Sequence, residues 1–557
     1  NIAVGRHAGG KISDGDNNIF IGDCAGCTVT TGCCNVIVGY RHQAASATGN
    51  TQFSIGVGST SWISGDSSFN IYDKNGTVIA AGFNPDAQEN LYAGTGAGNA
   101  SDADTCFNIG IGYSALYSQD ASGSYDGERN VAIGCLAMCK ATGGKEHVAI
   151  GRKAGAGIVA GYNNVFIGSY TGGDVSCTIN SEFNIGIGYG SLNGNVGHCN
   201  IAMGYESQYL GNGAHNFTVG RLAGAHLQSN NNVFIGEQVA RYTVTGNGNN
   251  IAIGKRAMHC AGGANHNTVL GNHAGKRITT GHCNIFMGYY AGSGDSGDVT
   301  GTNNVAIGSS AGFGLTSGSG HVLIGRCAGH EVTTNNTSVI IGEGAAQYGN
   351  SLSNVFIGLG AGCGVTGCTP AENVAVGCFA GRKIEGGSLN AFFGASAGCL
   401  NTSGKCNTVI GSEGAGALTT GSQNTILGSF GGYNLSSGSH NVAIGFCAQL
   451  PSATGNCQLV IGCNTSYWIS GDSNFDIVTN NIVPTSNNTK NLGSTGTRWA
   501  NIYTNDLQLS NEAKKDTGGN DVDGTWGDFT IQEGENDLFL INNRSGKKYK
   551  FNLTEVA

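Results

Sequence analysis

The sequence has little charge, little proline and no long apolar run. Lys, Arg, Asp and Glu make up 11% of the 557 residues, less than half of the usual share. Only 4 prolines accompany 97 glycines, which argues against collagen because collagen needs proline in a strict three-residue period. Abundant glycine also argues against a helical protein, since each interior glycine costs a helix roughly 1 kcal/mol. No stretch approaches the roughly 20 apolar residues of a membrane helix, so no membrane insertion is expected.

The charge that is present does not favour a nucleic-acid partner. The formal net charge is −9, and no Lys/Arg cluster stands out beyond Lys547–Lys548, whereas nucleic-acid binding needs a basic face. No signal peptide is visible. Residue 1 is Asn and already lies inside a repeat, so we expect the chain to be part of a longer or processed product.

What the sequence does have is one short motif, repeated along most of its length. The motif is Asn-φ-x-φ-Gly-x-x-Ala-Gly, with φ aliphatic, as in Asn164-Val-Phe-Ile-Gly168. Its glycine recurs 26 times, in arrays of 4 and 22 copies, most often 17 residues apart. Such a pattern is typical of a very short strand that ends in a bend. One strand of this kind buries too little surface, but stacked copies cover one another. The repeat therefore predicts an all-β fold, a parallel β-solenoid with coils of about 17 residues.

The position four residues before the motif glycine is Asn in nearly every copy. Asn tolerates the left-handed backbone region that a coil corner requires. Its amide both donates and accepts, so stacked Asn side chains predict a hydrogen-bonded ladder along the axis; a row of ligand-binding amides is the functional alternative. The predicted structural ladder includes Asn18, Asn35, Asn164, Asn200, Asn232, Asn267, Asn304, Asn354, Asn407 and Asn441. The exceptions in this column are Gln52, His147, His321, Ser338 and Gln458. Gln stands at the last copy of each array, which indicates an end-of-array variant.

Small residues follow the motif glycine at the third and fourth positions, as in Ala274–Gly275. A coil of about 17 residues is thin and has little interior. Small residues at one corner would let the coils of neighbouring chains approach closely. We therefore predict a homotrimer in which three solenoids share a central seam.

Each array is followed by a near-duplicate segment. Trp-Ile-Ser-Gly-Asp-Ser begins at Trp62 after the first array and at Trp468 after the second. The end of a solenoid presents an unpaired strand edge that must be covered. We therefore expect a cap whose aromatic residues close the last coil, namely Trp62, Phe69, Trp468 and Phe475. After the first cap, Asn75-Gly76 predicts a hairpin turn.

These features divide the chain into five parts. The first solenoid array covers residues 1–58, a cap and hairpin connector 59–89, the second array 90–462, a second cap 463–490, and a C-terminal β-domain 491–557. Residues 529–553 of the last part alternate in strand fashion between turns, which predicts a small antiparallel sheet. Two loops, Tyr117–Glu128 and Gly292–Gly301, lengthen their coils. Long loops on a rigid scaffold often carry binding, and the alternative is tolerated surface variation.

No catalytic residue, cofactor or metal site is predicted. The 20 cysteines are too few for a disulfide scaffold, and most recur at fixed repeat positions. They are interpreted as small half-buried residues in a reducing compartment, with cross-links between coils or chains as the alternative. Cys24-Ala-Gly-Cys27 has no second pair at zinc spacing. The stretch Asp521–Gly524 fails the EF-hand pattern, because Gly519 and Thr530 would occupy ligand positions 1 and 12.

Two features resemble a known family. The Asn-φ-Ala-φ-Gly-x-x-Ala array resembles repeats of phage tail-fibre proteins, and it is similar to the head repeats of trimeric autotransporter adhesins, which are shorter per coil. The segment Arg498-Trp-Ala-Asn-Ile502-Tyr503 looks like the Arg-Trp-x-x-Ile-Tyr element near the C-terminal end of many phage fibres. In those fibres a self-cleaving chaperone domain often follows, whereas here the chain continues into the small β-domain, an ending similar to structural proteins of phages that infect marine cyanobacteria.

The resemblance implies a structural virion fibre, a tail fibre assembled in the host cytoplasm. Its partners would be two further copies of the chain, other tail or baseplate proteins, and a glycan or receptor of the host surface. A bacterial surface adhesin is one alternative, although no heptad stalk and no membrane-anchoring strands are visible. A polysaccharide-depolymerising spike is another. An ice-binding solenoid is disfavoured because the Thr-Thr pairs recur in only some coils.

Overall fold

The structure is a computed structural model of the whole chain. It forms two compact units, Asn1–Ile477 and Val478–Ala557, each of which is described by itself. The residues that the structure describes are 1–65, 71–75, 78–80, 85–101, 104–118, 127–194, 196–242, 246, 248–295, 297–334, 337–349, 352–474, 476–479, 482, 492, 494–512, 515–516, 518, 520, 522–552 and 554.

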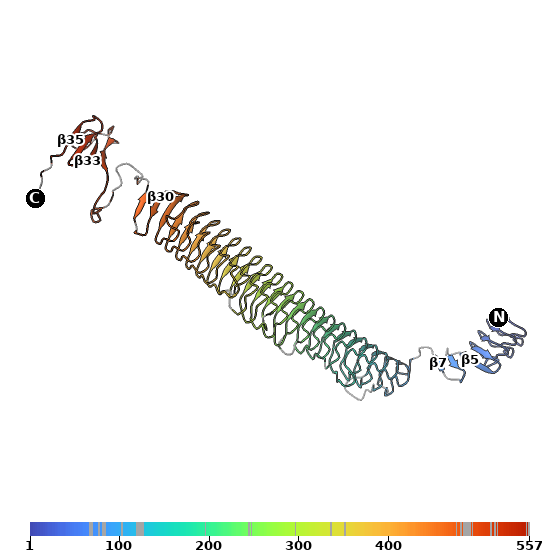
Figure 1. The fold of residues 1–557 in the computed structure, drawn as a ribbon. Coiled ribbons are helices and arrows are strands. Elements are labelled where there is room, and N and C mark those ends of the chain that lie inside the picture. Colours follow the sequence, from blue (N-terminus) through green and yellow to red (C-terminus); the bar gives the residue numbers. More distant parts are fainter. Residues whose placement is uncertain are drawn as a thin grey trace. The chain divides into compact units, whose positions relative to one another are not determined.

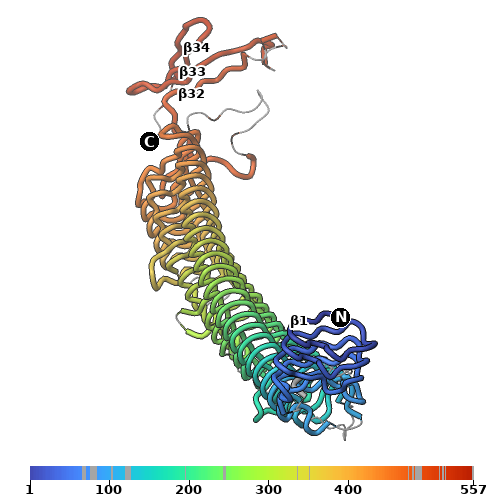
Figure 2. The backbone as a smooth tube through the Cα atoms, turned by 90° about the vertical axis from the view of Figure 1, so that its right-hand side faces the viewer, coloured from blue at the N-terminus to red at the C-terminus, as the bar shows by residue number. Residues whose placement is uncertain are grey.

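The second array is a parallel β-solenoid, as the repeat predicts (Figures 1 and 2). Each coil contributes one short strand, and each strand pairs in parallel with the next, as Ile251 does with Thr268 and Thr268 with Ile285, 17 residues apart. At a strand spacing of about 4.8 Å the 22 coils extend roughly 100 Å. The strands are β8 (Leu91–Ala93), β9 (Ile109–Ile111), β10 (Val131–Ile133), β11 (Val148–Ile150), β12 (Val165–Ile167), β13 (Ile185–Ile187), β14 (Ile201–Met203), β15 (Phe217–Val219), β16 (Val233–Ile235), β17 (Ile251–Ile253), β18 (Thr268–Leu270), β19 (Ile285–Met287), β20 (Val305–Ile307), β21 (Val322–Ile324), β22 (Val339–Ile341), β23 (Val355–Ile357), β24 (Val374–Val376), β25 (Ala391–Phe393), β26 (Thr408–Ile410), β27 (Thr425–Leu427), β28 (Val442–Ile444) and β29 (Leu459–Cys463).

The first array repeats this arrangement over four coils. Its parallel strands are β1 (Ile2–Val4), β2 (Ile19–Ile21), β3 (Val36–Val38) and β4 (Phe53–Val57). Antiparallel strands follow, namely β5 (Thr60–Gly65), β6 (Ile71–Asp73) and β7 (Val78–Ala80). The second array ends in the same way, since β30 (Ser466–Gly471) pairs antiparallel with β29 and β31 (Ile477–Thr479) comes next. Both arrays are thus closed by a reversed strand that pairs with the last coil.

The inside of the solenoid is filled by one residue per strand and by the turn that follows. The middle strand residue points inward, so Phe166, Phe234 and Phe286 are fully buried while their aliphatic neighbours are half-buried or exposed. The Ala three residues after the motif glycine also lies inside, and Ala274 has no exposed surface. The predicted role of this Ala at an outer seam is therefore wrong, because its methyl group belongs to the core of its own coil.

The motif glycine is required by the close approach of successive coils. Gly271 has a φ of 139°, and a Cβ on it would lie 2.4 Å from the carbonyl oxygen of Gly288 in the next coil. A left-handed residue also precedes each ladder position, as Asn163 does with a φ of 58°. The ladder Asn164 itself is not left-handed. The backbone argument for the Asn column is therefore wrong, and its hydrogen bonds must explain it.

The C-terminal unit holds a four-stranded antiparallel sheet. Its strands β32 (Asp506–Ser510), β33 (Asp528–Glu533), β34 (Leu538–Asn542) and β35 (Lys548–Lys550) pair in sequence order. The predicted antiparallel sheet over 529–553 is confirmed, and β32 adds an edge strand before it. None of the described residues of this unit is buried. The sheet therefore has no hydrophobic core of its own within a single chain.

Candidate functional site

The Asn column forms a continuous ladder inside the solenoid. The backbone N–H of Asn284 donates to Oδ1 of Asn267 (2.9 Å), and the Asn284 Nδ2 donates to the same oxygen (3.1 Å) and to the Gly301 carbonyl (3.0 Å). The next rung repeats this, since the backbone N–H of Asn304 donates to Oδ1 of Asn284 at 2.9 Å. The oxygen and the nitrogen of these side-chain amides therefore both hydrogen-bond within the protein. The ladder residues predicted from the sequence are all buried, namely Asn18, Asn35, Asn164, Asn200, Asn232, Asn267, Asn304, Asn354, Asn407 and Asn441.

Gln ends the ladder because no further coil lies beyond it. The Gln458 backbone N–H still donates to Asn441 Oδ1 at 2.8 Å. Its longer side chain turns back onto its own coil, where Nε2 donates to the carbonyls of Ser452 (2.9 Å) and Gly455 (2.8 Å). Gln52 makes the equivalent bonds at the end of the first array. The extra methylene of Gln thus lets its amide hydrogen-bond to the backbone of its own coil where no next ladder residue is present.

His147 takes the place of Asn in one rung. Its Nδ1 accepts from the Asn164 backbone N–H at 3.2 Å, which requires an unprotonated Nδ1. Burial lowers the pKa of His147 to about 4, and the backbone near Gly161 offsets this only in part. The imidazole is therefore neutral at pH 7 and acts as a structural acceptor, like the amide oxygen that it replaces.

The tryptophans of the two end segments do not close the last coil. Trp62 is 58% exposed and Trp468 is 74% exposed. Alternate residues of a strand point to opposite faces, so the inward position in β30 belongs to Tyr467, which packs on the core. Phe69 and Phe475 lie outside the described residues, as do Gly76, Gly519, Asp521 and residues 119–126 of the long loop Tyr117–Glu128.

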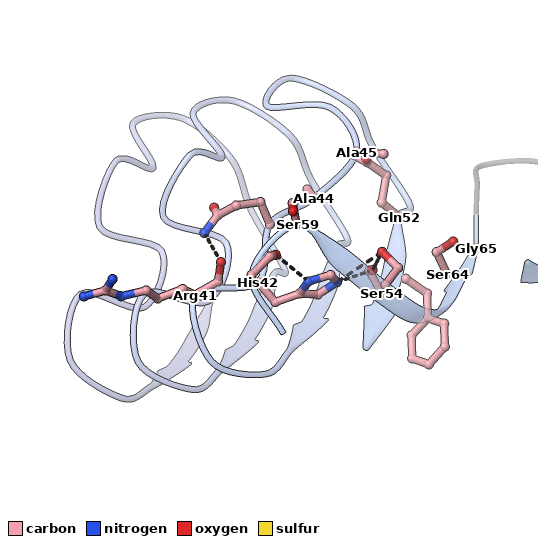
Figure 3. A pocket seen from close by; sticks show the side chains of 13 residues that line it. Arg41, His42, Ala44, Ala45, Gln52, Ser54, Ser59, Ser64 and Gly65 are labelled. Carbon is pink, nitrogen blue, oxygen red and sulfur yellow. Dashed lines mark hydrogen bonds between the residues drawn. The ribbon is translucent and has the colours of Figure 1, made fainter. Parts of the chain in front are cut away.

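A pocket lies at the end of the first array, beside the antiparallel pair of β4 and β5 (Figure 3). It has a volume of about 550 Å³. His42 is 1% exposed, and its Nδ1 lies 3.0 Å from the Gly58 carbonyl, which can only accept. Nδ1 therefore carries the proton and Nε2 accepts from the Ser54 Oγ at 2.6 Å. Ser61 Oγ completes the network, 3.1 Å from Ser54 Oγ.

Ser54 and His42 have the hydrogen-bond geometry of a hydroxyl nucleophile and its base. Comparison with the end of the second array, however, favours a structural role. The two end segments align at a constant offset of 406 residues, from Gly39 and Gly445 onward. In the second array the three positions of the network are Ala448, Val460 and Tyr467. Ala448 and Val460 are fully buried core residues. The same positions thus hold polar side chains at the end of the first array and apolar side chains at the end of the second. This favours a structural role for the polar network over an active site.

The triple change His42→Ala, Ser54→Val and Ser61→Tyr is expected to leave the first array folded, because it installs the residues of the second end. His42→Ala alone is expected to cost about 2 kcal/mol, since it leaves the Gly58 carbonyl without its donor and leaves Ser54 with only the Ser61 hydroxyl as a partner. Urea unfolding of the three proteins measures both effects. Hydrolysis of p-nitrophenyl acetate by the wild type that disappears in the triple variant would show an active site instead.

Eight of the 20 cysteines occupy left-handed positions in the turns of the coils. Cys34 has a φ of 58° five residues before its motif glycine, and Cys327 has a φ of 56° two residues after its own. All 20 are free thiols. Cys24 and Cys27 lie side by side, and the hydrogen bond between their thiols raises the pKa of Cys24.

No protein-family model and no curated protein matches the sequence. Within the described ranges, no group of three or more His, Cys, Asp or Glu is placed to hold a metal ion. Those ranges also hold no apolar helix of membrane-spanning length.

The pocket at His42 was not predicted from the sequence. Its signal was available, because comparing the two near-duplicate ends position by position shows polar residues replacing apolar ones.

Proposed function

We propose that this chain is a structural fibre, a non-enzymatic virion tail fibre of three identical chains that spans distance and attaches to the host cell surface. The observation that supports it best is the second array, an uninterrupted solenoid whose length is set by the number of coils. A fibre of this kind transmits contact over roughly 100 Å without needing a catalytic centre. The sequence resemblance to phage tail fibres points the same way.

The outer face of the strands supports association of the chains. Most strands place two aliphatic side chains outward, although Thr268, Thr408 and Thr425 interrupt one column. Several of these aliphatic side chains are about 40% exposed, including Ile167, Met203, Ile251, Ile285 and Ile410. The two columns are about 7 Å apart and run the length of the array. Monomeric proteins rarely expose continuous apolar patches above a few hundred Å². This face, which we call the aliphatic face, is the proposed seam between the three chains and replaces the Ala-Gly corner.

The C-terminal unit supports the same proposal independently. Trp499, Ile502 and Tyr503 of the Arg-Trp element are 64%, 66% and 92% exposed, and Leu507 and Leu509 of β32 are also exposed. A sheet of this size needs a covered apolar face to be stable. Association of several copies through these side chains would supply the core that one chain lacks.

Light scattering of the purified chain is expected to give three times the 56.6 kDa of one chain. Ile251→Glu with Ile285→Glu is expected to reduce the mass toward a monomer, because charges on the aliphatic face cannot be buried without partners. The matched control is Leu210→Glu with Tyr433→Glu, which adds the same charge at side chains that are 51% and 48% exposed in the turns. A wild-type mass of 56.6 kDa would contradict the trimer.

Attachment to a virion is tested separately. Immunogold labelling of particles from an infected culture is expected to place the chain on the tail, and antibody against it is expected to block adsorption to host cells. Labelling of the host outer membrane without labelling of particles would favour the adhesin alternative.

A further inference from the structure

One corner of the second array gathers positive charge in a chain that is acidic overall. Residues 221–277 contain six Lys or Arg and a single carboxylate, Glu237, although the whole chain has a net charge of −9. These cations lie far apart along the sequence, so they form no visible basic run. The coil repeat brings Arg241, Arg256 and Lys276 near one another, because they come from the turns after three successive strands, β16, β17 and β18. Arg241 and Lys276 each stand five residues after the motif glycine, as does His259 in the coil between them, and Arg256 stands two residues after its own motif glycine.

The cations surround two histidines and stacked aromatic rings. Arg241 lies 5.0 Å from the ring centre of Tyr242, which packs edge-on against His259 at 5.1 Å. His273 stacks on Tyr290 at 4.7 Å. Burial, together with the charges of Arg256, Arg241 and Lys276, lowers the pKa of His259 to about 4. Arg241, Arg256 and Lys276 therefore act on one imidazole and form a common surface.

Neighbouring cations form ion pairs with carboxylates, whereas Arg256 donates its Nε–H to the neutral Gln238 Oε1 at 2.9 Å. Lys255 pairs with Glu237 at 3.0 Å and Arg277 with Asp298 of the long loop at 2.8 Å. Among the described residues, no carboxylate pairs with Arg241, Arg256 or Lys276. Three buried nitrogen atoms in the same corner also lack a hydrogen-bond partner in the described structure, namely Arg241 Nε, His259 Nε2 and His273 Nδ1. Buried polar atoms normally have hydrogen-bond partners, so these nitrogen atoms leave the corner with hydrogen-bonding groups that an acidic ligand could satisfy.

We infer that this surface, formed by Arg241, Arg256, His259, His273 and Lys276, binds an acidic polysaccharide. The inference deepens the proposed function, since it names the class of cell-surface glycan that the fibre would contact. Arg241 and Lys276 stand at the same position of their coils, two coils apart, which is about 10 Å along the axis. This spacing suits a polymer that carries carboxylate or sulfate groups at intervals. Arg and imidazole N–H groups donate well to such anions. Duplex DNA fits less well, because three cations are few for a phosphate backbone and the rest of the chain is net acidic and would repel it.

Binding of fluorescent dextran sulfate to the full chain tests the inference, with neutral dextran as the ligand control. Tight, salt-sensitive binding of dextran sulfate and none of neutral dextran is expected. The variant Arg241→Gln, Arg256→Gln, Lys276→Gln is expected to weaken binding at least about tenfold, because charge-assisted contacts each contribute over 1 kcal/mol. The matched control Arg382→Gln, Lys383→Gln, Lys405→Gln removes the same charge elsewhere on the array and is expected to bind as the wild type does.

Circular dichroism of each variant verifies the fold, and a charge-retaining variant, Arg241→Lys with Arg256→Lys, is expected to keep most of the affinity. Equal loss of binding in both triple variants would overturn the inference in favour of overall charge, and so would unchanged binding in the first. Duplex DNA that binds as tightly as dextran sulfate, through the same residues, would show that the partner class is wrong. Tail labelling without dextran sulfate binding would overturn this inference alone and leave the proposed function standing.

Discussion

Gly271→Ala is expected to destabilise the second array by about 3 kcal/mol or more. The backbone at this position has a φ of 139°, which side chains of L-residues rarely adopt. The added Cβ would also lie 2.4 Å from the Gly288 carbonyl oxygen and 2.8 Å from its carbon. Both atoms belong to the backbone of the next coil, so no side-chain rotation relieves the contact. The coils must separate or the turn must unfold.

Hydrogen exchange is the measurement of choice for this variant, because a solenoid can open locally rather than as a whole. Faster exchange is expected in the strands on either side of the change, β17 to β19, and little effect in distant coils. Gly386→Ala is the matched control. Its φ is not in the left-handed range and its Cβ would meet no atom within 4 Å, so stability is expected to stay level or rise by up to about 1 kcal/mol. Similar losses in the two variants would contradict the packing argument.

Asn284→Leu is expected to be similarly costly, at about 3 kcal/mol or more. The side chain is fully buried, and its loss leaves the Gly301 carbonyl without a donor and the Asn304 N–H without an acceptor. Each unsatisfied buried backbone group costs roughly 1–3 kcal/mol. Leu has as many side-chain heavy atoms as Asn but no donor or acceptor, so its burial does not restore the two bonds. Urea unfolding monitored by circular dichroism measures the loss.

Asn284→His serves as the informative control, since His147 shows that imidazole can occupy a rung. At pH 8 it is expected to lose less stability than Asn284→Leu, because a neutral Nδ1 still accepts from the next coil. Its stability is then expected to fall with pH. A buried His has a folded pKa below its unfolded value of about 6.5, so its full contribution is present above pH 6.5 and is lost as pH falls toward about 4. For His147 itself the pKa of about 4 corresponds to a loss of about 3 kcal/mol. No added pH dependence in Asn284→His would contradict this account.

Much of the fold could be predicted from the sequence because each coil repeats one local pattern. The alternation in Asn164-Val-Phe-Ile-Gly168 defines a strand and a bend without reference to distant residues. The Asn column follows from the hydrogen bonds that an amide can make to copies above and below it. Gln52 and Gln458 even mark the last rungs, since the sequence shows where the copies stop. The antiparallel sheet after residue 528 follows from alternation and turns in the same way.

The sequence alone thus determined the coil length, the parallel stacking and the identity of the ladder, because identical units stacked in register make local chemistry periodic. Only the tertiary structure decided which side of the coil each column faces. It turned Ala274 inward and the aliphatic neighbours of Phe286 outward, and it placed Tyr467 rather than Trp468 over the last coil. It also brought Arg241, Arg256 and Lys276 together, although 15 and 20 residues separate them. The direction of a side chain and its distance from others depend on how the turns close each coil. The conformation of these turns is fixed by the packing of neighbouring coils and not by any single repeat.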